Sequence, residues 1–216
     1  MMFKLAEELR DSYKVLVTTS TKIYTPLKEK YDFICTDESM FSTYISMKEK
    51  GVYILGLGVN EENKILGLSE KHLASLEPHF DYMLIEADGA KAKALKGWNE
   101  FEPVIYSKTT KTVGIIDIQS WGIPICEDKV LRSDIFCEIA GAQQGETVEI
   151  KHLCKVILHP EGLFKGAQGE KILFINKAEE PKEVILAKLL ARQVTFMDNV
   201  FLNRLILGSI KTNIYI

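Results

Sequence analysis

Blocks of apolar residues with two different spacings alternate along the chain. Short continuous apolar runs predict strands, and longer segments with apolar residues three or four positions apart predict amphipathic helices. The predicted strands are residues 15–17, 33–35, 52–59, 64–68, 82–85, 112–117, 171–175, 204–208 and 213–216. The predicted helices are residues 2–13, a short helix from 25, then 39–50, 69–76, 132–140, 149–158 and 181–192. This alternation favours an α/β fold with a mostly parallel sheet covered by helices on both faces.

The strand at residues 82–85 is four apolar residues long and is predicted to be buried on both faces. Glu86, Asp88 and Gly89 follow it, where a parallel sheet binds ligands at its carboxyl edge. The two carboxylates could hold a hard cation, and Gly89 would let its N–H approach a phosphate. Glu-x-x-Gly at a strand end is also the second signature of P-loop nucleotide hydrolases. An ordinary strand followed by a turn often has the same sequence, so the Glu-x-x-Gly motif alone does not establish a nucleotide site.

Two further strands are followed by polar residues. Residues 18–22 carry three threonines, a serine and Lys22, which could bind phosphate or magnesium-bound water, or could cap turns. Asn176, Lys177 and Glu179 form Asn-Lys-x-Glu, one methylene from the Asn-Lys-x-Asp with which GTPases recognise guanine. A carboxylate accepts from the two N–H groups on the edge of guanine, and the lysine stem lies along the base. A helix N-cap at Asn176 is the structural alternative.

Composition and charge limit the class of protein. The chain has 216 residues, 46% of them hydrophobic and 26% charged, which suits one α/β domain over residues 1–216. A net charge of -3 argues against nucleic-acid partners and anionic membrane surfaces. No apolar run could span a bilayer and acids occupy the first residues, so we expect a cytoplasmic location. The four cysteines form no C-x-x-C pair and are expected to be reduced and mostly buried, and His152 with Cys154 is expected to be packed rather than metal-bound.

Two helices carry further expectations. The helix at residues 2–13 begins without Ser, Thr, Asp or Asn ahead of it, which leaves its first N–H groups without a local cap. In the helix at residues 181–192, five apolar residues are expected to form the buried side. They are Val184, Ile185, Ala187, Leu189 and Leu190.

Taken together, these motifs resemble the YqeC-type proteins, a family of accessory factors for selenium-dependent molybdenum hydroxylases. The resemblance covers nearly the whole chain and is most specific in Glu-Ala-Asp-Gly followed by Glu-Pro-Val-Ile. The matching segments are residues 18–22, 85–90, the Leu95-Lys96 pair, 102–105, Arg132 and 176–179.

The resemblance implies a P-loop NTPase-like fold, similar to the GTPases that deliver nickel or cobalt to enzymes. It implies Mg²⁺ and GTP or ATP as cofactors, and an apo-form of a molybdenum hydroxylase as partner. The roles it implies fall on eight residues: Glu86 for the magnesium-bound water, Asp88 and Gly89 for the terminal phosphate, Thr19 and Lys22 for the phosphate region, and Asn176, Lys177 and Glu179 for the base.

One part of the family pattern is absent. No G-x-x-x-x-G-K-[ST] loop occurs between Met1 and Ile216, and that loop supplies most of the phosphate grip. Triphosphate hydrolysis by these residues should therefore be very weak. We favour a chain that is N-terminally truncated relative to the family over true loss of the loop, because the opening helix lacks a cap. The sheet should then lack its first strand and show an unfilled slot beside residues 84–87.

Two other functions remain open at this point. The chain could be a non-catalytic adaptor that docks on the apo-hydroxylase through the lysine-containing loop 91–98 and the turn at Trp121. It could also be a small-molecule kinase, because the same fold hosts several chemistries.

Overall fold

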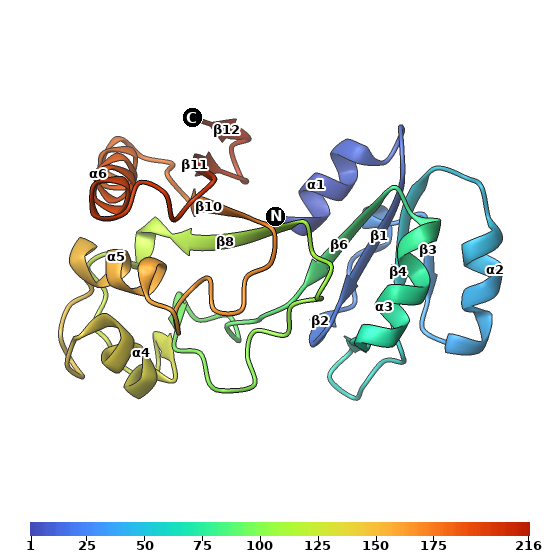
Figure 1. Ribbon diagram of the computed structural model, residues 1–216, viewed down its shortest axis with the longest axis horizontal. Coiled ribbons are helices and arrows are strands. Elements are labelled where there is room, and N and C mark those ends of the chain that lie inside the picture. The colour runs from blue at the N-terminus through green and yellow to red at the C-terminus, as the bar shows by residue number, and fades with distance from the viewer. The chain divides into compact units, whose positions relative to one another are not determined.

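The computed structural model describes residues 1–216 and is α/β, with parallel-stranded sheets and six α-helices (Figure 1). The chain divides into two compact units, Met1–Gly89 and Ala90–Ile216, each with a four-stranded sheet of its own. The single domain expected from the sequence stays a prediction. None of the six helices combines the length and the apolar run that crossing a bilayer requires.

The first unit contains three helices and six strands. The helices are α1 (Met2–Leu9), α2 (Phe41–Ser46) and α3 (Glu70–Leu76), with 3₁₀ turns η1 (Lys28–Lys30), η2 (Glu38–Met40) and η3 (Glu77–His79). The strands are β1 (Lys14–Thr19), β2 (Lys22–Tyr24), β3 (Phe33–Cys35), β4 (Gly51–Leu55), β5 (Lys64–Leu66) and β6 (Tyr82–Glu86).

The sheet of the first unit has the order β3-β4-β1-β6, and all of its pairs are parallel. Every residue of β1 is buried, so this central strand is covered on both faces, as expected for a parallel sheet. Ala6 of α1 belongs to the core cluster that includes Val15 and Ile54. As the sequence indicates, α1 has no side-chain cap at its N-terminus.

Strand β6 lies at the edge of this sheet and pairs only with β1. The prediction that residues 82–85 are buried on both faces is wrong: Tyr82 is 41% exposed and the other residues of β6 are half-buried. The reason is that no strand flanks β6 on its second side. An edge at this position agrees with the expected slot beside residues 84–87.

Element boundaries in this unit differ from the expectation at three places. The helix expected at 39–50 is η2 followed by α2 and ends at Ser46, where Met47 adopts an extended backbone ahead of the charged residues 48–50. The strand expected at 52–59 ends at Leu55, because Gly56 brings the backbone so close to Ile65 that a Cβ would meet it at 2.2 Å. The segment expected at 64–68 pairs antiparallel with β2, and the short helix expected from residue 25 is only the turn η1.

The second unit also contains three helices and six strands. The helices are α4 (Ser133–Ala140), α5 (Ile150–Leu158) and α6 (Pro181–Met197), with the 3₁₀ turn η4 (Ile118–Ser120). The strands are β7 (Leu95–Lys96), β8 (Lys111–Asp117), β9 (Val130–Leu131), β10 (Glu170–Asn176), β11 (Arg204–Ser209) and β12 (Ile214–Tyr215).

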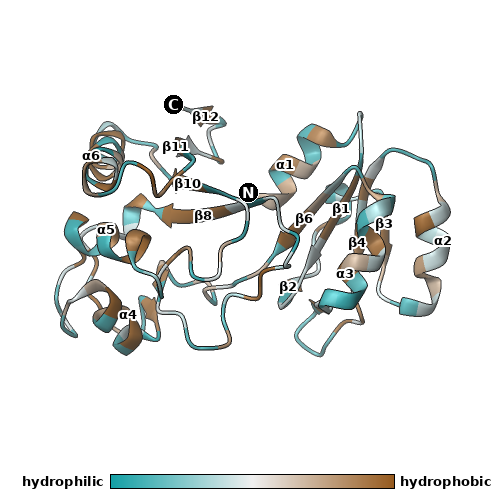
Figure 2. Ribbon diagram, in the orientation of Figure 1, coloured by the Kyte–Doolittle hydropathy of each residue, from teal (hydrophilic) through white to brown (hydrophobic).

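The sheet of the second unit has the order β12-β11-β10-β8, with β10 parallel to both of its neighbours and β12 antiparallel to β11. The central strand β10 is buried over residues 172–175. Its edge neighbour β8 is apolar, as Figure 2 shows, yet Val113 and Ile115 are 36% and 40% exposed, so the prediction of a buried strand holds there only in part.

Helix α6 departs most from the sequence prediction. It continues five residues beyond 192, to Met197, and its buried residues are Ala187, Leu190 and Val194. Ile185 and Leu189, expected on the buried side, are exposed. The core-facing positions are spaced three and four residues apart around residue 190, and this spacing turns 185 and 189 away from the core.

Candidate functional site

The first group of predicted residues gathers at the carboxyl end of β6. Glu86 ends β6, directly beside Thr19 at the end of β1 in the parallel register. The hydroxyl of Thr21 donates a hydrogen bond to Glu86 Oε2 at 2.9 Å, and Thr19 Oγ1 lies 2.9 Å from the same oxygen. The amide of Thr21 donates to Thr19 Oγ1 at 2.9 Å. Two strand ends and one turn therefore fix the orientation of the Glu86 carboxylate.

The other candidates of this unit lie around or away from that carboxylate. A Cβ added at Gly89 would lie 3.4 Å from Glu86 Oε1, so the glycine backbone passes close to the carboxylate. Asp88, which lies between Glu86 and Gly89 in the sequence, is half-buried. Lys22, expected to line a phosphate region, is exposed on β2. Thr21 was not singled out from the sequence, although it belongs to the same hydroxyl-rich segment.

The oxygen atoms at Glu86 are suited to a hydrated hard cation. Carboxylate and hydroxyl oxygens are the ligand types that Mg²⁺ prefers, and Mg²⁺ usually keeps several waters and takes one or two protein carboxylates. Nowhere in the chain do three or more His, Cys, Asp or Glu side chains gather as a protein-built metal cage requires. The donor set thus fits Mg²⁺ held mainly by water and by a phosphate ligand, and does not fit a cage.

The second group lies at the carboxyl end of β10. Asn176 ends the strand, opposite Asp117 at the end of β8, and its Oδ1 accepts a hydrogen bond from the Ile210 amide at 3.2 Å. Lys177 has a left-handed backbone with φ of 63°, and its Nζ lies 2.5 Å from Asp117 Oδ2. Asn176 is not a helix N-cap, because α6 is capped at Glu180. The structural alternative for this motif is therefore wrong.

Glu179 completes this group. The Ser209 hydroxyl donates to its Oε1 at 2.9 Å, and Lys211 Nζ lies 3.4 Å from its Oε2. These side chains surround a pocket of about 380 Å³. Its lining residues are Gln119, Asn176, Lys177, Glu179, Ser209, Ile210 and Lys211.

Sequence reasoning missed four of these contributors: Asp117, Gln119, Ser209 and Lys211. Asp117 ends β8 and Gln119 follows it, and Ser209 ends β11 and Lys211 follows it. The rule that polar residues at the carboxyl ends of neighbouring parallel strands meet would have found them, had the pairing of β8, β10 and β11 been known.

A third cluster joins residues that the family resemblance singled out. Glu102 receives a two-pronged hydrogen bond from Arg132, at 2.8 and 3.0 Å, and one from Lys96 at 2.6 Å. Burial by itself would raise the pKa of Glu102, but the bonds from Arg132 and Lys96 outweigh it and hold the pKa below the usual value. Lys96 is only 5% exposed. This cluster ties loop 97–102 to the start of α4 and presents no unpaired group for a ligand.

Two residues of the alternative docking segment are also buried. Trp98 is 7% exposed and Lys96 is held by Glu102. The interpretation of loop 91–98 as a docking surface is therefore wrong for these two side chains. Lys93 of the same loop donates a hydrogen bond to the Glu127 carbonyl oxygen and lies 3.8 Å from its carboxylate.

The remaining side-chain expectations concern thiols and histidine. All four cysteines are free, with Cys35 and Cys154 buried and the other two half-buried. His152 and Cys154 are both buried in α5, as packed residues. Burial lowers the pKa of His152 and raises that of Cys154 to about 11.

Comparison with known proteins identifies the family. The family described as YqeC protein matches residues 1–134, which is more than half of the chain. A protein of Escherichia coli (strain K12) named "Uncharacterized protein YqeC" is 27% identical over 190 residues, covering 86% of this chain and 74% of its own length. No solved structure matches the chain. The chain belongs to the YqeC family.

Proposed function

We propose that this protein binds a purine nucleotide, with GTP preferred to ATP, and serves as an accessory factor in the maturation of selenium-dependent molybdenum hydroxylases. The observation that supports nucleotide binding best is the pocket at the end of β10, where an amide, a lysine stem and a carboxylate line one cavity. This is the residue set that the recognition of a guanine edge needs.

The preference for guanine follows from hydrogen-bonding capacity. Guanine presents two N–H groups on the edge that a carboxylate would face, whereas adenine presents an acceptor nitrogen there, which repels a carboxylate. Ser209 and Lys211 orient Glu179, and an ionised carboxylate keeps further acceptor positions. Because Asn176 Oδ1 already accepts from Ile210, its Nδ2 is the group left to donate to a ring acceptor.

In the first unit, Glu86 would hold a water molecule of hydrated Mg²⁺, with Thr19 beside it. Asp88 and Gly89 would face the terminal phosphate, and Lys22 would contribute charge to the phosphate region. Mg²⁺ supplies charge neutralisation of the phosphate oxygens when it is bound. Since these 216 residues contain no G-x-x-x-x-G-K-[ST] loop, we expect binding without efficient hydrolysis, and hydrolysis only in a form that carries such a loop.

The proposed partner, an apo-form of a molybdenum hydroxylase, rests on the family resemblance. The segments that carry it include Arg132 and Glu102, which meet in the structure, and the residues at the ends of β6 and β10. A purely adaptor role is the rival proposal, and binding experiments separate the two.

Isothermal titration calorimetry tests the base pocket. With magnesium present, GTP and GDP should bind more tightly than ATP and ADP. Glu179→Gln should weaken guanine nucleotides by roughly 10- to 100-fold, because hydrogen bonds to a charged group contribute about 1.5–3 kcal/mol. Glu138→Gln on α4, an exposed carboxylate, is the matched control and should change nothing. Silence with every nucleotide, in this chain and in a longer form with the loop, would favour the adaptor.

A further inference from the structure

Helix α6 has an apolar stripe on the side opposite the core. Ile185, Leu189 and Phe196 are 66%, 43% and 89% exposed. At roughly 100° per residue these three positions fall within about 40° of the helix circumference. Ala187, Leu190 and Val194 occupy the opposite side and are buried. We call the exposed set the α6 stripe. An exposed apolar stripe of this length costs solubility and often marks an interaction site.

The charges that flank the α6 stripe are mostly positive. At 100° per residue, Lys182, Lys188 and Arg192 lie about 40°, 80° and 40° from the midline of the stripe. The Lys182 ammonium lies over the Trp121 ring, 4.9 Å from its centroid. Asp198 directly follows the helix, and its Oδ1 accepts from the amides of Val200 and Phe201. Glu183 is the one acidic residue of α6, and its carboxylate accepts from the backbone amides of residues 179 and 180 instead.

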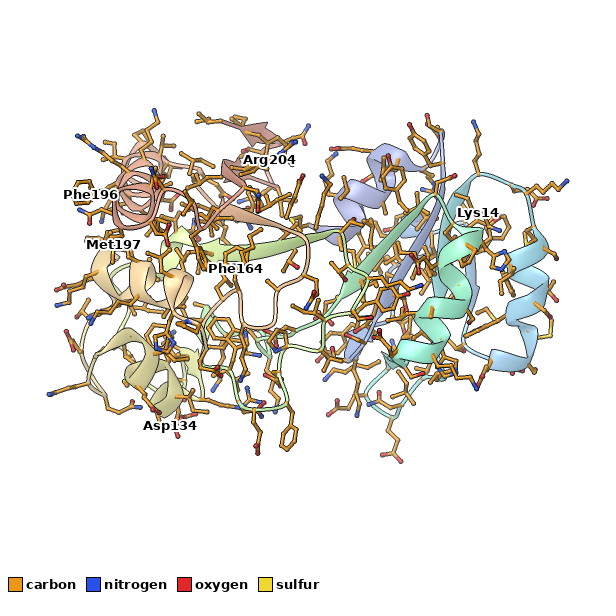
Figure 3. All side chains as sticks on the ribbon, in the orientation of Figure 1. Lys14, Asp134, Phe164, Phe196, Met197 and Arg204 are labelled. Atoms are coloured by element: carbon orange, nitrogen blue, oxygen red, sulfur yellow. The ribbon has the colours of Figure 1, made fainter.

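A shallow groove of about 1200 Å³ runs along the carboxyl half of the stripe. Its lining residues include Leu189, Arg192, Phe196, Met197 and Leu205 of β11, with Asp198 as the one acidic residue among them. Figure 3 labels Phe196 and Met197 at the outer end of α6. A groove beside protruding side chains can receive the side chains of another helix.

We propose that the α6 stripe binds an amphipathic helical segment of a partner protein that carries carboxylates beside its apolar residues. Apolar side chains of the segment would pack on Ile185, Leu189 and Phe196, and a carboxylate among them would pair with Arg192. Arginine surrounded by apolar contacts is a common centre of binding energy at protein interfaces. The proposal does not depend on nucleotide binding.

Two other occupants fit less well. An anionic lipid surface fits less well because the whole chain carries a net charge of -3, and only three large apolar side chains project from the stripe. A second copy packed by two-fold symmetry would place Lys188 and Arg192 against the same residues of its partner, with no acid between them. An acidic segment would place carboxylates next to Lys188 and Arg192 and so pair with both cations.

A pair of designed peptides tests this proposal by fluorescence anisotropy on the whole chain. The acidic peptide is a labelled helix of about 18 residues, roughly 27 Å long, with leucines at i, i+4, i+7 and i+11 and glutamates flanking them. The second peptide has lysine in place of each glutamate. The acidic peptide should bind at least about tenfold more tightly, and more weakly as salt is raised. Arg192→Glu should reverse that preference, and Phe196→Ser should weaken binding of the acidic peptide.

The control is Lys71→Glu on α3, a charge reversal at an exposed position outside α6, which should leave both affinities unchanged. Circular dichroism checks that each variant is folded, which we expect because the substituted side chains are exposed. Equal affinity for the two peptides, or no binding of either, would overturn the proposal. It would also be overturned by binding to phosphatidylserine vesicles, or by a dimer in light scattering, if Phe196→Ser abolished either one.

Discussion

The ends of β6 and β10 have similar sequences but different surroundings. Each strand is a short apolar run that ends in a polar motif, Glu-x-x-Gly after one and Asn-Lys-x-Glu after the other. Strand β10 has a parallel neighbour on each side, whereas β6 has one neighbour, β1. Three strand ends therefore contribute to the pocket at β10, and only two contribute to the group at Glu86. A ligand pocket at a sheet edge depends on how many strand ends meet there, and the motif alone does not create it.

The same difference appears in burial. Leu173 in β10 is fully buried, while Leu84 in β6 is half-buried at an edge that has no neighbouring strand. Exposed strand edges are liabilities in soluble proteins, because their backbone groups can pair with another chain. Within the first unit, the backbone groups of β6 are paired on one side only, by β1.

The largest expected effect is the difference in the free energy of unfolding between alanine variants of these two leucines. Leu173→Ala should lower the free energy of unfolding by about 2–5 kcal/mol, because it removes a fully buried side chain from the core. Leu84→Ala should cost only about 1 kcal/mol, because part of that side chain is already in contact with water. Urea denaturation measures both. Tryptophan fluorescence reports the second unit, which holds both Trp98 and Trp121, and circular dichroism reports the whole chain.

Equal losses for the two variants would contradict the assignment of β6 as an edge strand. The result would mean that another segment covers Leu84 in solution. Hydrogen exchange would then show protection along β6 comparable to that along β10, in place of the faster exchange expected at an edge.

Much of the element pattern is predictable from sequence because local signals are strong. Ser69 caps α3, and Gly141 ends α4 in a left-handed conformation, both as the sequence indicates. What the sequence does not reveal is strand order, which comes from contacts between distant segments. The apolar runs of β6 and β10 look alike, so their edge and central positions could not be told apart.

The candidate site residues could be singled out from the sequence to a similar depth, and their role as a site stays a prediction. Glu86 and Asn176 stand out in the sequence because each directly follows an apolar run, and Glu179 stands out as the last residue of the Asn-Lys-x-Glu motif. Their partners Ser209 and Thr21 do not, because a hydroxyl is a common turn residue and only the pairing of the strands shows which carboxylate it meets. The exposed side of α6 was misassigned for a related reason: apolar residues occur on both sides of that helix, and only packing decides which side is buried.

A smaller effect tests whether the stability of the second unit also depends on the ion pair between Arg132 and Glu102. Arg132→Met removes the two-pronged bond to Glu102 and should cost about 1.5–3 kcal/mol at pH 7, because a half-buried carboxylate loses a charged partner. The pKa of Glu102 is depressed in the folded protein, so the stabilisation is present above the unfolded pKa and is lost as the pH falls through the folded pKa. The difference between wild type and variant should therefore shrink in acid.

Urea denaturation at pH 7 and at more acidic pH, followed by tryptophan fluorescence, checks this prediction. Lys111→Met is the matched control, because the Lys111 and Glu170 side chains are 52% and 43% exposed and such pairs contribute about 0–1 kcal/mol. A cost for Arg132→Met that stays constant with pH would show that the arginine acts by packing and not through the charge of Glu102.

The smallest effect is the stability cost of removing the hydroxyls that orient the carboxylates of Glu179 and Glu86. Ser209 is 1% exposed, donates to Glu179 and accepts from the Lys211 amide at 3.1 Å. Ser209→Ala should therefore cost about 1–2 kcal/mol, since it leaves buried groups without a partner. Thr21→Val at the half-buried end of β1 and β6 should cost about 0.5 kcal/mol, because water can replace the lost bond to Glu86. If Thr21→Val costs as much as Ser209→Ala, the Glu86 carboxylate is shielded from water in solution, and the contrast between an open strand end at β6 and an enclosed one at β10 fails.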